Sequence, residues 1–223
     1  MARGSHTETG RTFLSVAFGK IRQKHTDTGQ RVDENTPLAV RRETQAGKES
    51  WALEFDFVSG IIQKIFYKES QEYENTFEVV IADGPENLQL SFTEDSRFWF
   101  DFMKKLPNID LSKEVKITAY DFVDKDKKRR VGISIEQGGT KIGSYYEKKG
   151  EDGKWTLLHG FPAADGVDFK DKDETKIYFI KVKKFLKNQF TEIFGDKWGK
   201  SETAAETKTD EVSADEPPSD LPF

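Results

Sequence analysis

Residues 76–92 read TFEVVIADGPENLQLSF, two apolar runs around a turn signal, and this stretch decides the fold class. Thr76 to Ala82 is rich in β-branched and aromatic residues, which favours a strand. Asp83-Gly84 is a turn signal, and Asn87 to Phe92 is typical of the returning strand. The stretch therefore predicts a β-hairpin, the last part of a β-meander over Trp51 to Phe92.

Upstream of the hairpin, alternation of apolar and polar residues predicts more strands. Trp51 to Phe57 places Trp51, Leu53, Phe55 and Phe57 on one face and Ala52, Glu54 and Asp56 on the other. Ser59-Gly60 permits a bend in the chain. The expected upstream strands are Thr12 to Lys20, Thr36 to Glu43, Trp51 to Phe57 and Ile61 to Lys68.

Downstream of the hairpin, apolar residues recur at helical spacing from Phe98 to Leu106. Asp95 or Ser96 can cap this helix, and Pro107 stops it. Strands are expected again at Glu114 to Val123, Arg130 to Glu136, Lys141 to Glu147 and, as a short addition, Lys154 to Leu158.

The last periodic segment, Asp173 to Gly195, predicts a long helix. An alternative is that Lys176 to Val182 is a final strand and only the remainder is helical. The apolar stripe of the helix is expected to contain Ile177, Ile180, Phe185, Leu186, Phe190, Ile193 and Phe194.

Many short strands with one helix between two strand groups favour a mainly β protein built on a closed antiparallel barrel. An OB-fold places its helix between the third and fourth strands, as here, although this order also fits other barrels or a sandwich. We expect a flexible N-terminus (1–11), an OB-fold domain with a C-terminal helix (12–198) and a disordered acidic tail (199–223).

Composition limits the classes of function. The 223 residues carry a formal net charge of −5, and residues 199–223 alone hold seven acids against two lysines. The chain has no cysteine, which excludes disulfides and thiol catalysis and fits a reducing compartment. No apolar run approaches a membrane span and no signal peptide is recognisable, so we expect a cytoplasmic protein.

The search for an active site favours a protein that is not an enzyme and needs no metal or cofactor. His6, His25 and His159 are scattered, and no phosphate-binding or zinc-protease motif occurs. Asp101 with Glu114-Val115-Lys116 is a weak match to a nuclease metal site. Because Asp101 falls on the expected helix, we favour a structural role for it.

Aromatic residues that alternate with cations are typical of single-strand binding, in which bases stack on rings and phosphates follow a basic groove. On one strand face Phe66 stands between two lysines, and on another Tyr120 and Phe122 stand near Lys116. Residues 127–130, KKRR, form a basic hairpin. The predicted binding residues are Lys64, Phe66, Lys68, Lys116, Tyr120, Phe122, Lys127, Lys128, Arg129, Arg130, Lys141 and Tyr145.

The C-terminal tip, Asp220-Leu221-Pro222-Phe223, resembles the peptide with which bacterial single-stranded DNA-binding proteins recruit partners. The family tip is Asp-Asp-Asp-Ile-Pro-Phe. This chain keeps its last Asp, Pro and Phe, replaces Ile with Leu, and has Pro218 and Ser219 where the other two Asp would be. Body and tail together are more like the OB-fold single-stranded DNA-binding proteins of tailed bacteriophages.

The resemblance implies sequence-independent binding and protection of single-stranded DNA during replication, recombination and repair. It also implies recruitment of replication and repair proteins through the tip, with no catalysis and no cofactor. The alternative is a protein-interaction or DNA-mimic module, of an antirestriction or scaffold type, that does not bind DNA.

Overall fold

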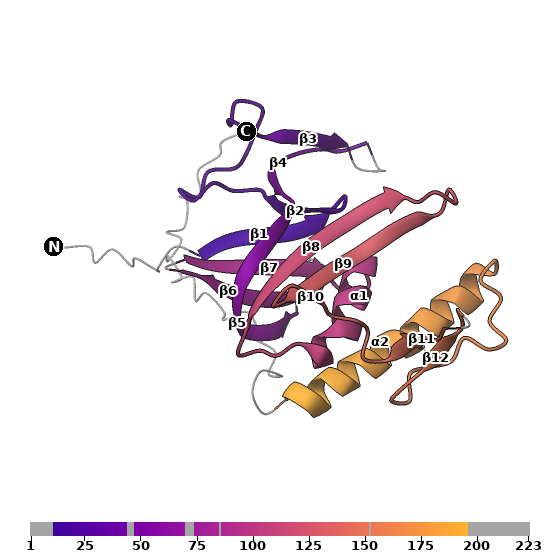
Figure 1. The fold of residues 1–223 in the computed structure, drawn as a ribbon. Coiled ribbons are helices and arrows are strands. Elements are labelled where there is room, and N and C mark those ends of the chain that lie inside the picture. Colours follow the sequence, from indigo (N-terminus) through magenta and orange to yellow (C-terminus); the bar gives the residue numbers. More distant parts are fainter. Residues whose placement is uncertain (1–10, 44–46, 70–73, 85, 152, 196–223) are drawn as a thin grey trace, which may run out of the picture.

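The computed structural model describes residues 11–43, 47–69, 74–84, 86–151 and 153–195 (Figure 1). The predicted flexible N-terminus, apart from Arg11, and the predicted acidic tail with its tip lie outside the described residues. In chain order the elements are β1 (Arg11–Ala17), β2 (Lys20–Gln23), β3 (Val40–Glu43), β4 (Glu49–Phe55), β5 (Phe57–Lys68), β6 (Thr76–Asp83), β7 (Glu86–Thr93), α1 (Arg97–Lys105), the short 3-10 helix η1 (Leu106–Asn108), β8 (Glu114–Val123), β9 (Arg129–Gln137), β10 (Thr140–Lys141), β11 (Glu147–Lys149), β12 (Trp155–Leu157) and α2 (Lys172–Phe194).

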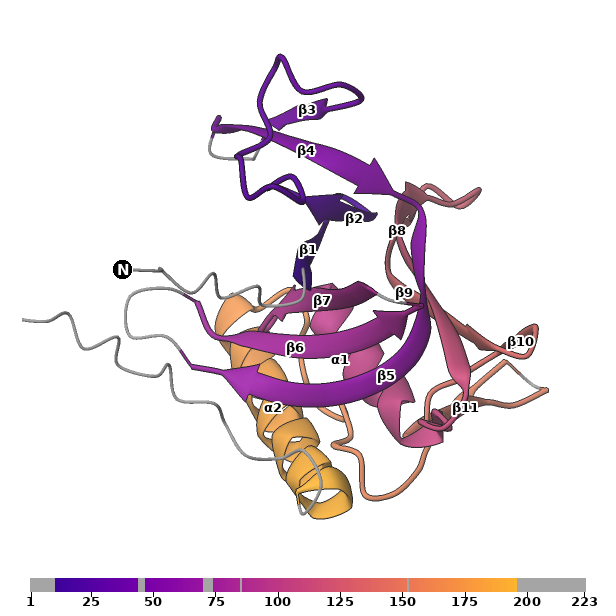
Figure 2. The ribbon, with the colours of Figure 1, turned by 90° about the vertical axis from the view of Figure 1, so that its left-hand side faces the viewer.

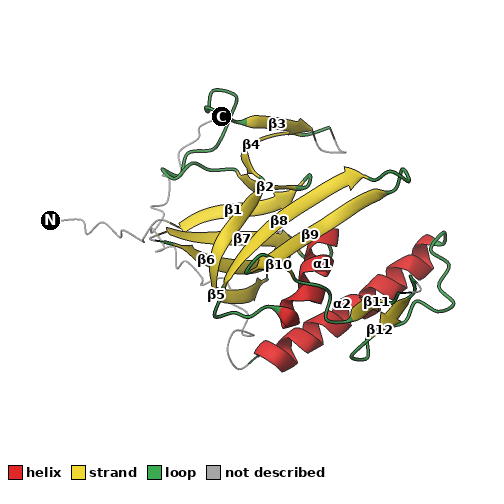
Figure 3. Ribbon diagram, viewed as in Figure 1, coloured by secondary structure: helices red, strands yellow, loops and turns green. Residues whose placement is uncertain are grey.

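The protein is mainly β, as predicted (Figure 3). Among the described residues, ten strands form one sheet in the order β10-β9-β8-β5-β6-β7-β1-β2-β4-β3, and β11 pairs with β12 separately. The predicted closed antiparallel barrel is not found. The strand order is open, with β10 and β3 at its ends, and β1 runs parallel to β7. The sheet is therefore mixed.

The sheet is nevertheless strongly curled. Only Asp56 separates the end of β4 from the start of β5, yet β4 pairs with β2 and β5 pairs with β6. Strands β6, β7, β1 and β2 lie between β5 and β4 in the strand order. The sheet must therefore curve so that it starts on β5 and returns to β4, the other half of the same continuous β4–β5 segment (Figure 2). At Gly60 within β5, a Cβ would lie 2.8 Å from Ile81 Cγ2, so only glycine allows the strands to approach this closely.

The predicted meander is confirmed for its last three strands, whereas its first strand, expected at Trp51 to Phe57, pairs with β2 and β3 instead. β5 pairs with β6, and β6 pairs with β7, both antiparallel. Tyr67 lies opposite Phe77, and Phe77 opposite Phe92, so the three rings share the core face of the sheet. Gly84 adopts a φ of +59° in the connecting turn, which explains the glycine of the turn signal.

Helix α1 closes this core. The Ser96 side chain accepts a hydrogen bond from the Trp99 backbone N–H, which confirms one of the two expected caps. Trp99 and Phe102 are fully buried against the sheet, and the Phe102 ring lies 4.9 Å from that of Phe92. Both helices cover the same side of the sheet (Figure 3).

Residues 172–194 form one helix, so the alternative of a final strand at Lys176 to Val182 is wrong. The predicted apolar stripe is only partly correct. Val182, Leu186 and Phe190 are buried at every fourth position, whereas Ile177 and Ile180 are each 54% exposed. The helix is therefore rotated relative to the prediction, with Val182 on the buried side instead of Ile177 and Ile180, while the predicted Phe190 does contact Tyr67 and Phe77.

Several expected strands have different boundaries. The expected strand Trp51 to Phe57 ends at Phe55, and the expected strand Ile61 to Lys68 already begins at Phe57. Thr12 to Lys20 is broken by a hairpin turn at Phe18-Gly19, where both residues have positive φ, so β2 starts as a new strand. Only Val40–Glu43 of the expected strand at 36–43 pairs with a neighbour. The expected strand at 141–147 leaves the sheet after Lys141. No helix among the described residues is long and apolar enough to cross a membrane.

Candidate nucleic-acid interface

A groove of about 960 Å³ runs between α1, the β8–β9 pair, residues 143–159 and α2, and we call it the helix-side groove. It brings together two of the predicted binding residues, Tyr120 and Tyr145. Its lining is Arg97, Phe100, Asp101, Lys104, Lys105, Asn108, Tyr120, Val131, Gly143, Ser144, Tyr145, Glu147, Lys148, Lys149, Trp155, Leu158, His159 and Phe179.

One wall of the helix-side groove is the segment 143–159, which is held against the helices. The Tyr145 backbone N–H donates to the Lys104 carbonyl at 2.8 Å, and Lys104 Nζ pairs with Glu147 at 2.9 Å. The buried Tyr146 ring lies 5.3 Å from the Phe185 ring on α2. These contacts place Tyr145 beside α1 even though the chain has left the sheet.

Tyr120 forms the floor of the groove because its cross-strand partner is Gly132. A Cβ at Gly132 would lie 2.8 Å from Tyr120 Cζ, so the ring occupies the space that a side chain would need. The phenol hydroxyl reaches Asp101 Oδ2 on α1 at 3.4 Å. Partial burial, with the charge of Asp101, raises the pKa of Tyr120 to about 12.

Asp101 is a structural residue here, as the sequence indicated. Its Oδ2 accepts hydrogen bonds from the Ile133 backbone N–H at 2.7 Å and from Lys105 Nζ at 2.9 Å. Glu114 begins β8, six residues before Tyr120, which places it roughly 20 Å away along an extended strand. In the part of the chain that the structure describes, no group of acidic and histidine side chains is arranged to hold a metal ion.

A stacked pair of rings stands at the mouth of the helix-side groove. Tyr145 and His159 lie with ring centroids 3.8 Å apart and planes 6° apart. Tyr145 is half-buried and His159 is exposed. The sequence analysis, in which His159 is only one of three scattered histidines, missed this arrangement because the two rings are fourteen positions apart along the chain.

The electrostatic balance of the helix-side groove is positive. Five cations and two carboxylates line it, a difference of +3. Lys104 and Lys105 are paired with the two carboxylates, Glu147 and Asp101. The other three cations, Arg97, Lys148 and Lys149, are exposed at the rim.

A second groove of about 380 Å³ lies over β1, β2, β6 and β7 of the curled sheet, and we call it the sheet groove. It is lined by Phe13, Leu14, Ser15, Arg22, Lys24, His25, Lys68, Glu74, Thr76, Glu78, Gln89 and Ser91. Its floor is the buried carboxylate of Glu78, which accepts hydrogen bonds from Thr76, Gln89 and Ser91. Three cations against two carboxylates leave this groove close to neutral.

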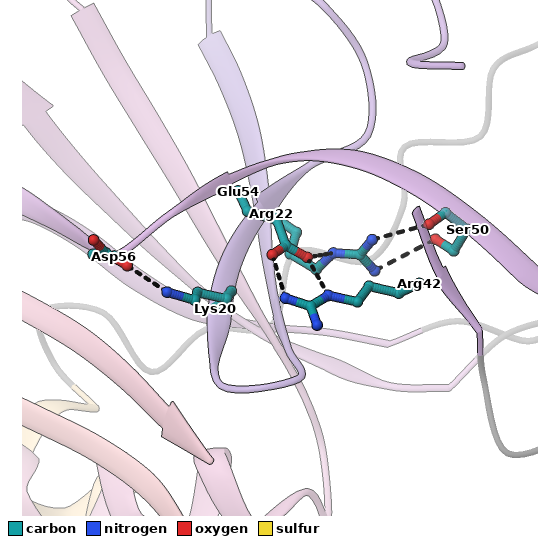
Figure 4. A network of polar contacts seen from close by, with 6 residues as sticks. All are labelled: Lys20, Arg22, Arg42, Ser50, Glu54 and Asp56. Atoms are coloured by element: carbon teal, nitrogen blue, oxygen red, sulfur yellow. Dashed lines mark hydrogen bonds and ion pairs between the residues drawn. The ribbon is translucent and has the colours of Figure 1, made fainter. Parts of the chain in front are cut away.

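The sheet groove is bounded by a buried ionic network that anchors the β3–β4 hairpin to β2 (Figure 4). Arg22 Nε lies 3.2 Å from Glu54 Oε1, and Arg42 donates to both oxygens of Glu54 at 3.0 and 2.7 Å. Arg22 also donates to the Ser50 carbonyl at 3.1 Å. The hydrogen bonds from Arg42 lower the pKa of Glu54, and burial lowers the pKa of Arg22.

The prediction that Phe66 is an exposed stacking platform is wrong. Lys64, Phe66 and Lys68 do share a face, but the Phe66 side chain is only 3% exposed. Lys64 Nζ lies over its ring at 4.7 Å, and the buried Glu78 stands opposite it. Lys68 lines the sheet groove and is the only one of the three to line either groove.

The remaining predicted residues lie along β8–β9 and on β10. Phe122 is 53% exposed with its ring 5.8 Å from that of Tyr120, while Lys116 Nζ lies over the Phe57 ring at 4.3 Å. In the basic hairpin, Lys127 and Lys128 are exposed, whereas the two arginines form ion pairs with carboxylates, Arg129 with Asp121 and Arg130 with Asp124. Lys141 is exposed on β10, outside both grooves.

Several groove residues were missed by the sequence analysis. Trp155 and Phe179 are 63% and 42% exposed, and both line the helix-side groove with Phe100. Lys148 and Lys149 follow Tyr145 closely in the chain and offered a local signal. No local signal indicated that α1 and α2 contribute to the groove, because their apolar residues also fit a core stripe.

Comparison of the chain with protein-family models, with curated proteins and with solved structures found no match. The interface is therefore interpreted from its own geometry.

Proposed function

We propose that the protein binds single-stranded DNA without sequence preference, and that the bases enter the helix-side groove. The observation that carries this proposal is the convergence of exposed rings and exposed cations in one groove, from three separate segments of the chain. Single-strand binding needs these two components together, since bases stack on rings and phosphates follow cations.

The cations and the aromatic rings have different roles in this proposal. Arg97, Lys148 and Lys149 stand at the rim, where phosphates can reach them from solvent. Trp155 and Phe179 offer exposed faces inside the same groove. Every base has such a face to stack on, so binding through these rings tolerates any sequence.

From the groove, the bound single-stranded DNA continues along β8. The Tyr120 and Phe122 rings are adjacent, and the strand that carries them ends at the basic hairpin. Lys127 and Lys128 there can contact phosphates directly. Arg129 and Arg130 must first exchange Asp121 and Asp124 for phosphate, so we expect them to contribute less than the lysines.

We further infer an OB-like scaffold from the curl of β4–β5, β6, β7, β1 and β2. The long stretch β4–β5 pairs at both ends of the curl, β1 lies parallel to β7, and α1 follows β7 directly. An OB-fold is itself a partly open five-stranded barrel, so the open strand order is compatible with this inference.

The roles in replication, recombination and repair rest on the resemblance of the C-terminal tip. We propose that the Phe223 ring enters an apolar pocket on a partner protein while its α-carboxylate pairs with a cation there. Removal of Phe223 alone keeps the acidic side chains of the tail, and should abolish capture of replication proteins in a pull-down from host extract. Equal capture by both proteins would contradict this role. A cytoplasmic location, in the host cell if a phage encodes the protein, belongs to the same proposal.

The groove assignment is tested by the salt dependence of oligo-dT binding, followed through tryptophan fluorescence. For single strands the slope of log affinity against log salt changes by about 0.7 for each phosphate that the protein neutralises. A Lys148→Gln/Lys149→Gln variant neutralises two phosphates fewer and should therefore have a slope smaller by about 1.4. The matched control, Lys24→Gln/Lys68→Gln, removes two cations of the sheet groove and should leave the slope unchanged.

The control also decides between the grooves. A change of slope in the Lys24→Gln/Lys68→Gln variant alone would move the binding site to the sheet groove. If the unmodified protein shows no response to oligo-dT in fluorescence or gel-shift titrations, the single-strand proposal fails. A protein-interaction or DNA-mimic module is then the better interpretation.

A further inference from the structure

The stacked pair Tyr145–His159 has the geometry of two neighbouring bases. Its centroid separation of 3.8 Å is close to the rise of about 3.4 Å per base step in a stacked strand, and its interplanar angle of 6° makes the two rings nearly parallel, as stacked bases are. The Tyr146 ring meets Tyr145 at 86° and packs into the core. The exposed ring of the pair is therefore the imidazole of His159.

His159 lies in a tight turn. The Phe161 N–H donates to the Leu158 carbonyl at 3.0 Å, which closes a four-residue turn. The two central residues, His159 and Gly160, have φ of +53° and +70°. Positive φ at both central positions is typical of a type I′ turn, in which Asn-Gly is the preferred pair.

Histidine is thus a poorer choice than asparagine for the turn itself. Asparagine is the residue that this turn favours most, although histidine also adopts positive φ more readily than most residues. The ring of His159, stacked on Tyr145, is the feature that asparagine could not supply.

We propose that His159 is the stacking platform on which an unpaired nucleobase docks, with Tyr145 as the fixed ring beneath it. The inference rests on the proposed function and identifies the residue that receives the base. It replaces the direct base contact predicted for Tyr145, because the imidazole covers one face of that ring.

The platform also determines the class of ligand. A base within a duplex has both faces covered by its neighbours, so only an unpaired base can extend the Tyr145–His159 stack. The platform contacts the face of a base and makes no hydrogen bond to its edge. We therefore expect a preference for single strands over duplex with little preference for base type.

The test is the variant His159→Asn, which removes the ring and creates the Asn-Gly pair that the turn favours. Thermal stability should be unchanged or higher, while affinity for a short oligo-dT should fall about tenfold. His159→Phe restores a ring at the same place and should recover affinity, even though its backbone is less favourable there. The matched control is His25→Asn, which changes an exposed histidine of the sheet groove and should bind like the unmodified protein.

Two outcomes would overturn the inference. Unchanged affinity in His159→Asn would mean that the ring contacts no base. Higher affinity would mean that the imidazole only covers Tyr145 and is displaced by the base. Both differ from failure of the proposed function, in which the unmodified protein itself does not bind oligo-dT.

Discussion

The helix-side groove and the sheet groove lie at different places on the molecule and use similar residue types in different ways. In the helix-side groove, Trp155, Phe179 and His159 are exposed and three cations stand at the rim. On the sheet-groove face, the Phe66 ring is covered and Arg22 is buried in an ionic network. One region leaves its rings and cations exposed to solvent, whereas in the other the ring is covered and the buried cation is paired with a carboxylate.

The comparison teaches that aromatic and basic residues on one strand face do not by themselves indicate a binding surface. Lys64, Phe66 and Lys68 alternate as well as Lys116, Tyr120 and Phe122 do. Their surroundings differ, because Phe66 stands opposite a buried glutamate while Tyr120 stands opposite a glycine. We therefore expect substitutions near the sheet groove to change stability, and substitutions in the helix-side groove to change binding.

The largest expected effect is on the sheet-groove side. Glu54→Ala leaves Arg22, whose side chain is 1% exposed, without its buried partner. Breaking a buried ion pair in this way costs about 3–5 kcal/mol in the free energy of unfolding, which denaturant titration measures. The pKa of Glu54 is lowered in the folded state, so this stabilisation is present above its ordinary pKa and is lost as the pH falls through the lower value.

A double variant distinguishes the effect of the Arg22–Glu54 ion pair from the effect of the packing around it. Arg22→Met with Glu54→Leu removes both charges, and a buried pair replaced by apolar residues is often nearly neutral for stability. If Glu54→Ala unfolds with the same midpoint as the unmodified protein, the network does not anchor the β3–β4 hairpin. The contrast between the two grooves then disappears.

A smaller effect is expected in the floor of the helix-side groove. Gly132→Ala places a Cβ 2.8 Å from Tyr120 Cζ, so the ring must move away from Asp101. Overpacking of this kind costs about 1–3 kcal/mol, and we expect weaker oligo-dT binding with a pKa of Tyr120 that falls toward its ordinary value. Ultraviolet titration of the phenol and oligonucleotide binding are the two measurements.

Gly143→Ala is the matched control for stability, because its added Cβ has nothing within 4 Å. This variant should unfold like the unmodified protein. If Gly132→Ala loses stability but binds oligo-dT normally, Tyr120 supports the fold and takes no part in the interface.

The helix α1, the meander and β8 could be predicted from the sequence because their signals are local. Ser96 and Pro107 mark helix ends, and Gly84 marks a turn, through backbone preferences that act within a few residues. The rotation of α2 could not be predicted, since several of its faces carry apolar residues and packing against Tyr67 and Phe77 selects one. The parallel pairing of β1 with β7 has no local signal either.

The sequence alone determined which residues are strand or helix formers, where the chain turns, and which aromatic residues stand among cations. These properties depend on backbone sterics and on the periods of helix and strand, which neighbouring residues specify. Only the tertiary structure decided that Phe66 is covered, that Tyr120 lies across Gly132, and that His159 meets Tyr145. Exposure and stacking depend on residues distant in the chain, and the curl of the sheet and the packing of the helices bring those residues together.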